Sequence, residues 1–206
     1  MIEINEIKHL VAVGAWNNAI FTPEWMKKFI LSDYSNINVE VPIAFNNSLR
    51  FTTEDFVFAI VNSRLEIMIK NNPQNAISCL RGILQKLIHT PIIGFGINFK
   101  FHTNKSELND ELWKSFFVDS PLLKLNKEFS PLENSTTALF KISDNNKLRL
   151  NIIKNQDESV SFDFNYDYLV RSAQELMDVL GPDDNLFINL HEKTTSLLNN
   201  YFDLKL

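Results

Sequence analysis

The stretch that decides the fold lies in the last quarter of the chain and reads Val160-Ser161-Phe162-Asp163-Phe164-Asn165-Tyr166-Asp167-Tyr168. Its even positions are apolar and its odd positions are polar. Side chains alternate between the two faces of a β-strand, so this strand has one apolar and one polar face. Antiparallel sheets with one buried and one solvated face contain such strands. We therefore predict an antiparallel sheet in the second half of the chain.

Two more strands are predicted directly before this one. Residues 138–152 alternate in the same way and form a hairpin if residues 144–146 make a three-residue loop. A second loop at residues 154–158 pairs the hairpin with the last strand and places Arg149 opposite Asp163. The three strands then form a meander whose apolar face is continuous, and cross-strand neighbours on that face stabilise it.

Helices are predicted after the meander. Residues 169–180 have apolar side chains at spacings of three and four, and Gly181-Pro182 ends this helix. Asp184 is a candidate N-cap for a final helix, whose apolar side includes residues between Phe187 and Tyr201.

The first half contains a hairpin with a well-defined register. A two-residue turn at Asn62-Ser63 joins residues 56–61 to residues 64–70. This turn brings six apolar residues together on one face, and a slip by one residue would break the match. The predicted pairs are Ile60 with Leu65, Phe58 with Ile67, and Phe56 with Ile69.

Clear start and stop signals place the remaining elements of the first half. Thr22-Pro23-Glu24 begins a short helix, because threonine caps the first turn and proline suits its first position. Asn72-Pro73 opens a longer amphipathic helix that Pro91 ends. Strands are predicted in residues 3–15, in residues 38–45 before a turn at 46–48, and in residues 93–101.

These elements indicate an α+β fold. We predict a sheet-plus-helix half in residues 1–104, a connector with a short helix in residues 105–136, and a meander with helices in residues 137–206. The two halves are expected to form a single compact unit, with one curved sheet and long helices packed on one face. Hairpins followed by an amphipathic helix occur in both halves, which suggests an internal duplication.

Composition narrows the class of protein. The 206 residues are 45% hydrophobic with a net charge of −5, and this acidic balance argues against nucleic acid as the main partner. A single cysteine, Cys79, excludes an intramolecular disulfide and favours a reducing compartment. The acidic N-terminus does not resemble a signal peptide, and no apolar run reaches the roughly 18 residues of a membrane helix. We predict a cytoplasmic protein without a membrane partner.

Asp163 and Asp167 are the first candidate site, because two carboxylates on one strand face can act as an acid/base pair or hold a hard cation. The alternative is charge pairing with Arg149 opposite and Lys147 diagonally across, and we favour this alternative.

Histidines give a weaker signal for a metal. His191-Glu192 lies on a predicted helix, but Thr195 stands where a zinc protease needs its second histidine. The other histidines are His9, His89 and His102, which are far apart in the sequence. We therefore predict no metal site.

Two further features have structural explanations. Gly94-Phe95-Gly96 lies inside an alternating strand, whereas a phosphate-binding loop needs its glycines in a turn, so these glycines indicate backbone twist or the close approach of another element. Cys79 falls on the apolar side of a helix and is expected to be buried and unreactive.

Large aromatic residues near loops form the last candidate set, which includes Trp16, Trp25, Trp113, Phe116 and Phe117. Such residues anchor protein interfaces. Core packing is the alternative, and we favour it.

Five short motifs occur in order along the chain: Arg50-Phe51-Thr52-Thr53-Glu54-Asp55, Ile93-Gly94-Phe95-Gly96-Ile97-Asn98-Phe99, Asp163-Phe164-Asn165, Leu190-His191-Glu192 and Tyr201-Phe202. In these motifs and their order the chain resembles a sporadically distributed bacterial family of uncharacterised α+β proteins. The resemblance implies a bacterial cytosolic protein from defence or mobile-element neighbourhoods. It supplies no catalytic, cofactor-binding or metal-ligating residue.

We predict a non-catalytic binding or assembly module of a bacterial multiprotein system, whose partner is another protein or a second copy. The alternative is a small-molecule protein or enzyme with a cleft between the sheet and a long helix, where Tyr166, Tyr168, Asn98 and His191 would lie. A third class, nucleic-acid binding, would need a patch formed by Lys100, Lys105 and Lys114.

Overall fold

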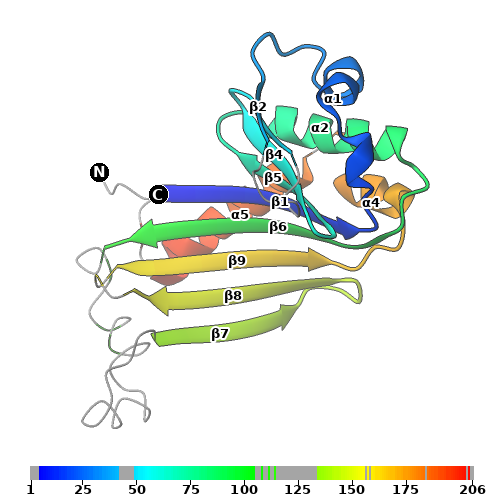
Figure 1. Ribbon diagram of the computed structural model, residues 1–206. Helices are drawn as coiled ribbons and strands as arrows, with labels where there is room; N and C mark the ends of the chain where they lie inside the picture. Colours follow the sequence, from blue (N-terminus) through cyan, green and yellow to red (C-terminus); the bar gives the residue numbers. More distant parts are fainter. Residues whose placement is uncertain are drawn as a thin grey trace.

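Nine antiparallel strands form a single sheet in the computed structural model of this chain (Figure 1). The structure describes residues 5–41, 49–104, 134–155, 159–183 and 185–202, with the single residues Leu108, Glu111, Lys114, Asp157 and Leu204. The strands are β1 (Asn5–Gly14), β2 (Asn38–Glu40), β3 (Arg50–Thr52), β4 (Phe56–Val61), β5 (Arg64–Ile69), β6 (Ile92–Thr103), β7 (Asn134–Lys141), β8 (Asn146–Lys154) and β9 (Val160–Tyr168). The helices are η1 (Asn18–Ile20), α1 (Pro23–Phe29), α2 (Pro73–Lys86), α4 (Ala173–Leu180) and α5 (Leu186–Phe202).

The two halves of the chain meet at the centre of the sheet. The strand order is β2-β3-β4-β5-β1-β6-β9-β8-β7, so β1 and β6 are neighbours. Strand β5 returns beside β1 and is followed by α2, and β9 returns beside β6 and is followed by α4. The two similar paths begin at β1 and at β6, whereas the predicted first half, residues 1–104, includes β6. The predicted α+β class with one curved sheet is confirmed.

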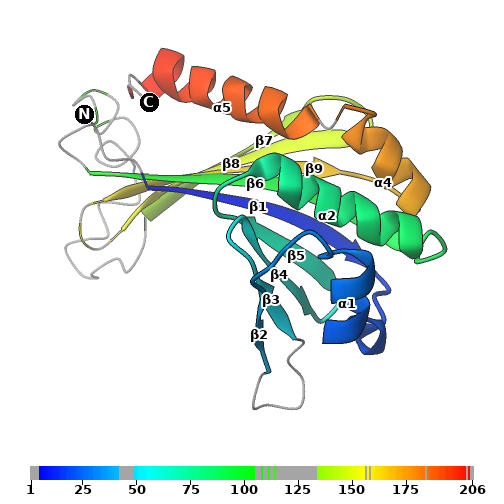
Figure 2. The ribbon, with the colours of Figure 1, turned by 90° about the horizontal axis from the view of Figure 1, so that it is seen from above.

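The helices cover one face of the sheet. Figure 2 shows α2, α4 and α5 on the same side of β1, β6 and β9, while β2–β5 bend away toward the other side. We call the face opposite these helices the open face. The alternation of the central strands explains the two faces, because their apolar side chains point toward the helices and their polar ones toward the open face.

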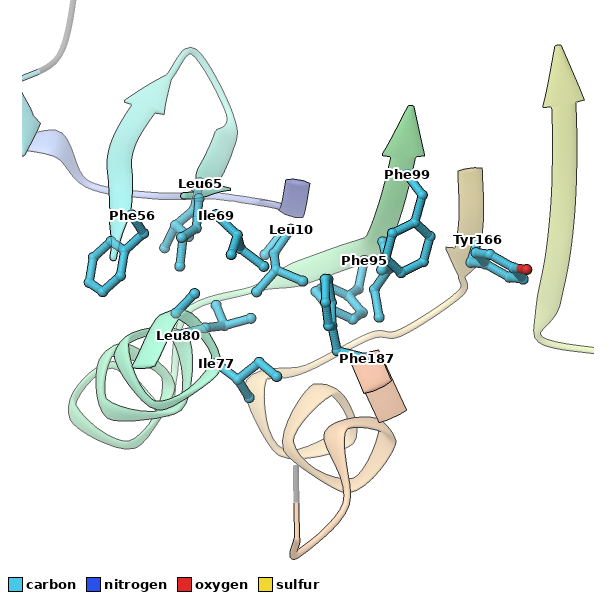
Figure 3. Packing of buried hydrophobic residues seen from close by; sticks show 14 of the residues in the cluster. Leu10, Phe56, Leu65, Ile69, Ile77, Leu80, Phe95, Phe99, Tyr166 and Phe187 are labelled. Carbon is cyan, nitrogen blue, oxygen red and sulfur yellow. The ribbon is translucent and has the colours of Figure 1, made fainter. Parts of the chain in front are cut away.

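Buried aromatic and aliphatic side chains fill the space between sheet and helices (Figure 3). Phe99 from β6 lies 5.0 Å from the ring of Phe187 at the start of α5, measured between ring centroids. Ile77 and Leu80 of α2 are fully buried in the same cluster as Leu10 of β1. One continuous core therefore joins both halves of the chain.

Caps fix the helix starts where the sequence predicts them. The Thr22 hydroxyl accepts a hydrogen bond from the Trp25 N–H at 3.2 Å, and the Asn72 side chain accepts one from the Gln74 N–H at 3.0 Å. Gly181 ends α4 with a φ of 73°, a conformation that favours glycine. These boundaries are confirmed.

Register was predicted correctly for the β4–β5 hairpin and incorrectly in the meander. Asn146, predicted in the loop between the first two meander strands, is the first residue of β8, so Phe140 rather than Ile142 lies opposite Leu148. Strands β4 and β5 pair as predicted, with Phe58 opposite Ile67, and Asn62 in their turn adopts a φ of 56°. In the pairing of β8 with β9, however, Asp163 lies opposite Asn151, and Arg149 lies opposite Asn165. The prediction was wrong by two residues because β8 extends to Lys154 and the loop begins one residue later.

Some predicted elements fall outside the described residues. These are the turn at 46–48, most of the connector at 105–136 with its short helix, and the Asp184 cap. The strand predicted in residues 38–45 is described only as β2, which ends at Glu40.

Candidate functional site

A groove of about 490 Å³ crosses the open face near one end of the central strands. Five strands contribute to it: β1, β5, β6, β8 and β9, with Leu139 from β7 at its rim. The groove thus brings together side chains that are up to about 150 positions apart in the sequence, and it lies on the side of the sheet away from the helices.

Two glycines of β6 form part of the groove floor. Gly94 and Gly96 lie within the strand, as predicted; Gly94 is half-buried and Gly96 is buried. A Cβ atom added at Gly96 would lie 3.5 Å from Asn165 Oδ1 and 3.7 Å from Asp167 Oδ1. Polar side chains of β9, rather than another backbone element, therefore lean over this position.

Three basic side chains surround the floor. Arg64, Lys147 and Arg149 line the groove and are exposed. Within the described part of the chain, none of them forms a salt bridge, in contrast to Lys8, Lys100 and Lys141. Their nearest cross-strand acid is Asp167, which lies opposite Lys147 in the pairing of β8 with β9, so the three cations still exceed the acidic groups beside them.

Two carboxylates, Asp144 and Asp167, also line the groove. Asp144 forms a salt bridge with Lys141 outside it. Burial raises the pKa of Asp167, whereas Arg149, a hydrogen bond with Asn165 and Lys147 act in the opposite direction. Three cations against Asp167 leave a positive balance, so the groove favours an anionic ligand.

The rim of the groove is apolar. Ile93, Leu139 and Leu169 line it with 66%, 59% and 53% of their side-chain surface exposed. Exposed aliphatic side chains gathered beside charged groups are typical of interaction sites. The groove therefore offers contacts both to an anionic group and to an apolar one.

The structure separates the two predicted carboxylates. Asp163 forms a salt bridge with Lys100 of β6, with 3.4 Å between Nζ and Oδ1, whereas Asp167 lines the groove. The predicted alternative of charge pairing is correct in kind, but its partner Arg149 was wrong because of the register shift.

Replacing Asp163 by asparagine is expected to cost about 1 kcal/mol or less in the free energy of unfolding, because the ion pair with Lys100 is partly exposed. Urea denaturation of Asp163→Asn and of Lys100→Gln should give two similar, small changes. A protein that stays folded but loses its biological activity in Asp163→Asn would instead assign Asp163 a functional role.

The four residues predicted for a sheet–helix cleft do not converge. Asn98 lies on the open face and lines the groove, whereas Tyr168 borders the groove but packs against the core, with 6.0 Å between its ring centroid and that of Phe95. On the other face, Tyr166 is fully buried with its hydroxyl 2.9 Å from Thr194 Oγ1. His191 Nε2 lies 2.6 Å from Glu6 Oε1 on that same side. The groove and the predicted cleft are therefore on opposite faces of the sheet.

Other predicted features lie where they support the fold. Cys79 is buried in α2, and burial raises the pKa of its thiol, so it is a poor nucleophile. Trp16 is buried and its indole N–H donates to the Ala12 carbonyl at 2.9 Å. Trp25 packs against Phe21, with 5.5 Å between ring centroids. For these two tryptophans, core packing is confirmed.

Several residues of the weaker hypotheses cannot be placed. Trp113, Phe116, Phe117 and Lys105 lie outside the described residues, which leaves Lys100 and Lys114 of the predicted basic patch. No group of three histidine, cysteine, aspartate or glutamate side chains suitable for a metal occurs among the residues that the structure describes.

Sequence reasoning missed Arg64, Lys147 and Arg149 as a group. Alternation alone places each of them on the polar face of its strand, but only the adjacency of β5, β1, β6, β9 and β8 brings them to one groove.

Neither models of known protein families nor curated protein sequences yield a match to this chain. None of the helices in the described ranges is long and apolar enough to cross a membrane.

Proposed function

We propose that this protein is a non-catalytic binding module of a bacterial multiprotein system, which holds an acidic and apolar segment of a partner protein in the open-face groove. The observation that carries the proposal is the set of three exposed cations without salt-bridge partners among the described residues, next to three exposed aliphatic side chains. The resemblance to an uncharacterised bacterial family favours a system that is linked to defence or to mobile elements.

Charge favours an acidic partner. Aspartate or glutamate side chains on the partner would pair with Lys147 and Arg149, and complementary charge increases both the rate of association and its specificity. Apolar side chains of the same segment would cover Ile93 and Leu169, which removes exposed aliphatic surface from water.

Binding fits better than catalysis because the candidate reactive groups already have partners or are inaccessible. Asp163 pairs with Lys100, His191 pairs with Glu6, and the Cys79 thiol is buried. The Glu6 carboxyl is the partner of His191. Burial raises the pKa of this carboxyl, but hydrogen bonds from His191 and Lys8 outweigh burial and leave the pKa below its usual value.

The test reverses charge inside and outside the groove. Lys147→Glu with Arg149→Glu should weaken binding of the co-purified partner at least about tenfold, or roughly 1.4 kcal/mol. Lys193→Glu also replaces a cation by an anion, but at an exposed position of α5 on the other side of the sheet. This control should leave binding unchanged. The partner would be identified by mass spectrometry after tagged expression in the native host, and the affinities would be measured by calorimetry with purified components.

Equal binding by the groove variant and by the Lys193→Glu control would overturn the groove as the partner site. Thermal melting of all three proteins must show that the variants are folded. Salt provides a second readout, because an ionic interface should weaken as the ionic strength rises.

A second candidate function is the binding of a small anionic molecule in the same groove. The volume of about 490 Å³ supports it, since small-molecule pockets span roughly 300–1,000 Å³. Native mass spectrometry distinguishes the two functions: a retained small anion that is lost in the Lys147→Glu, Arg149→Glu variant favours this candidate, and a stoichiometric protein favours the first.

A further inference from the structure

Strand β7 forms one edge of the sheet. Its eight residues pair with β8 from Asn134 to Lys141 without a shift in register, and no other described strand pairs with it. The N–H and C=O groups that point away from β8 are therefore available to another strand. Such an edge is a ready template for pairing with a second chain.

This edge lacks the features that usually prevent pairing. Residues 134–140 contain no proline and no charged side chain, and the pairing with β8 shows no bulge. Lys141, at the end of the strand, forms a salt bridge with Asp144 at 2.6 Å. The opposite edge, β2, has only three residues and ends in Glu40. The two edges of the sheet therefore differ in length and in charge.

Apolar side chains are exposed on both faces of this edge. Leu139 lies at the groove rim, and Phe140, which is 50% exposed, follows it and points to the other face. Ile142 is exposed directly after the strand. A new strand placed beside β7 would cover apolar surface on both sides as well as satisfy the backbone groups.

We propose that β7 pairs antiparallel with β7 of a second copy of this chain, with the two Leu139 residues opposite each other at the twofold axis. In this register Ala138 of one copy lies opposite Phe140 of the other, so a small residue faces a large one on both sides of the axis. The open faces of both copies then lie on the same side of one continuous eighteen-stranded sheet, which is twice the nine strands of a single copy.

The self-complementary sequence of β7 favours a second copy as the occupant, because pairing about Leu139 sets Ala138 against Phe140 and opposes no like charges. The chain carries a net charge of −5, which opposes self-association over most of its surface. Along β7, by contrast, self-pairing brings uncharged residues against uncharged residues, and like charges do not meet across the axis. A closed twofold contact also removes this edge from further pairing.

The mass in solution tests the proposal directly. Light scattering at high protein concentration should give twice the 23.9 kDa of a single chain. Leu139→Lys places two ammonium groups opposite each other and should give a monomer, whereas Leu169→Lys, at an equally exposed position outside β7, should remain a dimer. A monomeric wild-type protein, or a Leu139→Lys dimer, would overturn the proposal.

Cross-linking tests the register. Opposed residues of an antiparallel pair lie about 4.5–5.5 Å apart between Cα atoms, which suits a disulfide. Leu139→Cys should therefore cross-link under mild oxidation, since the native Cys79 is buried. Ser135→Cys should not, because the two copies of residue 135 would be about 26 Å apart. Efficient cross-linking at 135 and none at 139 would exclude this register. Leu139 and Leu169 also lie at the groove rim, so the Lys147→Glu, Arg149→Glu variant separates the two proposals. It leaves β7 unchanged and should remain a dimer whether or not the groove binds a partner.

Discussion

Replacement of Phe162 by aspartate is expected to unfold the whole protein. Phe162 is the third residue of β9, is buried, and packs against Phe202 of α5 with 4.9 Å between ring centroids. Loss of a buried phenylalanine side chain costs about 3–5 kcal/mol. A carboxylate left without a partner in that position adds several kcal/mol more. The sum is comparable to the total stability of a typical domain, which is about 5–15 kcal/mol.

Unfolding should extend beyond the second half, because β9 pairs with β6 and β6 pairs with β1 in one sheet. Circular dichroism should show loss of strand and helix signal together, and urea titration should show no cooperative transition. Asp163→Asn, one residue further along the same strand but on the open face, serves as the matched control and should remain folded. A cooperative transition near the wild-type midpoint in Phe162→Asp would contradict the packing described for β9.

Replacement of Asp55 by alanine is expected to cost about 3 kcal/mol, because a buried polar network loses its central acceptor. Asp55 is only 7% exposed and accepts hydrogen bonds from Asn75 Nδ2 at 2.6 Å, from the Tyr34 hydroxyl at 3.0 Å and from the Asn72 N–H at 3.3 Å. These contacts join the segment after α1, the β3–β4 loop and the start of α2. Tyr34→Phe removes one donor while the acceptor remains, and should cost about 1 kcal/mol.

Stability should also depend on pH through Asp55. The hydrogen bond from Asn75 lowers the pKa of this carboxyl most; burial raises it, and the bonds from Tyr34 and the Asn72 backbone lower it further. Because the pKa is lower in the folded state, the stabilising contribution is present above the ordinary value of 3.8 and is lost as the pH falls through the folded pKa. Urea midpoints at pH 7 and in acid should differ less for Asp55→Ala than for the wild type. An unchanged difference would show that Asp55 does not carry this acid sensitivity.

Local patterns were sufficient wherever neighbours in the sequence are neighbours in space. The β4–β5 hairpin was predicted with its register, because only one register combines the Asn62-Ser63 turn with all six apolar residues on one face. The start of α2 followed from Asn72-Pro73 in the same way. For β8 and β9, however, a shift of two residues keeps every side chain on its own face, so alternation could not distinguish the true register from the predicted one.

By itself, the sequence determined the α+β class, the apolar and polar face of each central strand, the starts of α1 and α2 and the end of α4, since these depend on residues a few positions apart. It did not give the start of α4, which is Ala173 rather than residue 169. The tertiary structure alone decided that β1 and β6 join the halves, that Arg64 shares a groove with Lys147, and that β7 lies at an edge. Strand order and the neighbours of a side chain across a sheet depend on contacts between distant segments. Periodicity within one segment contains no information about which other segment will lie beside it.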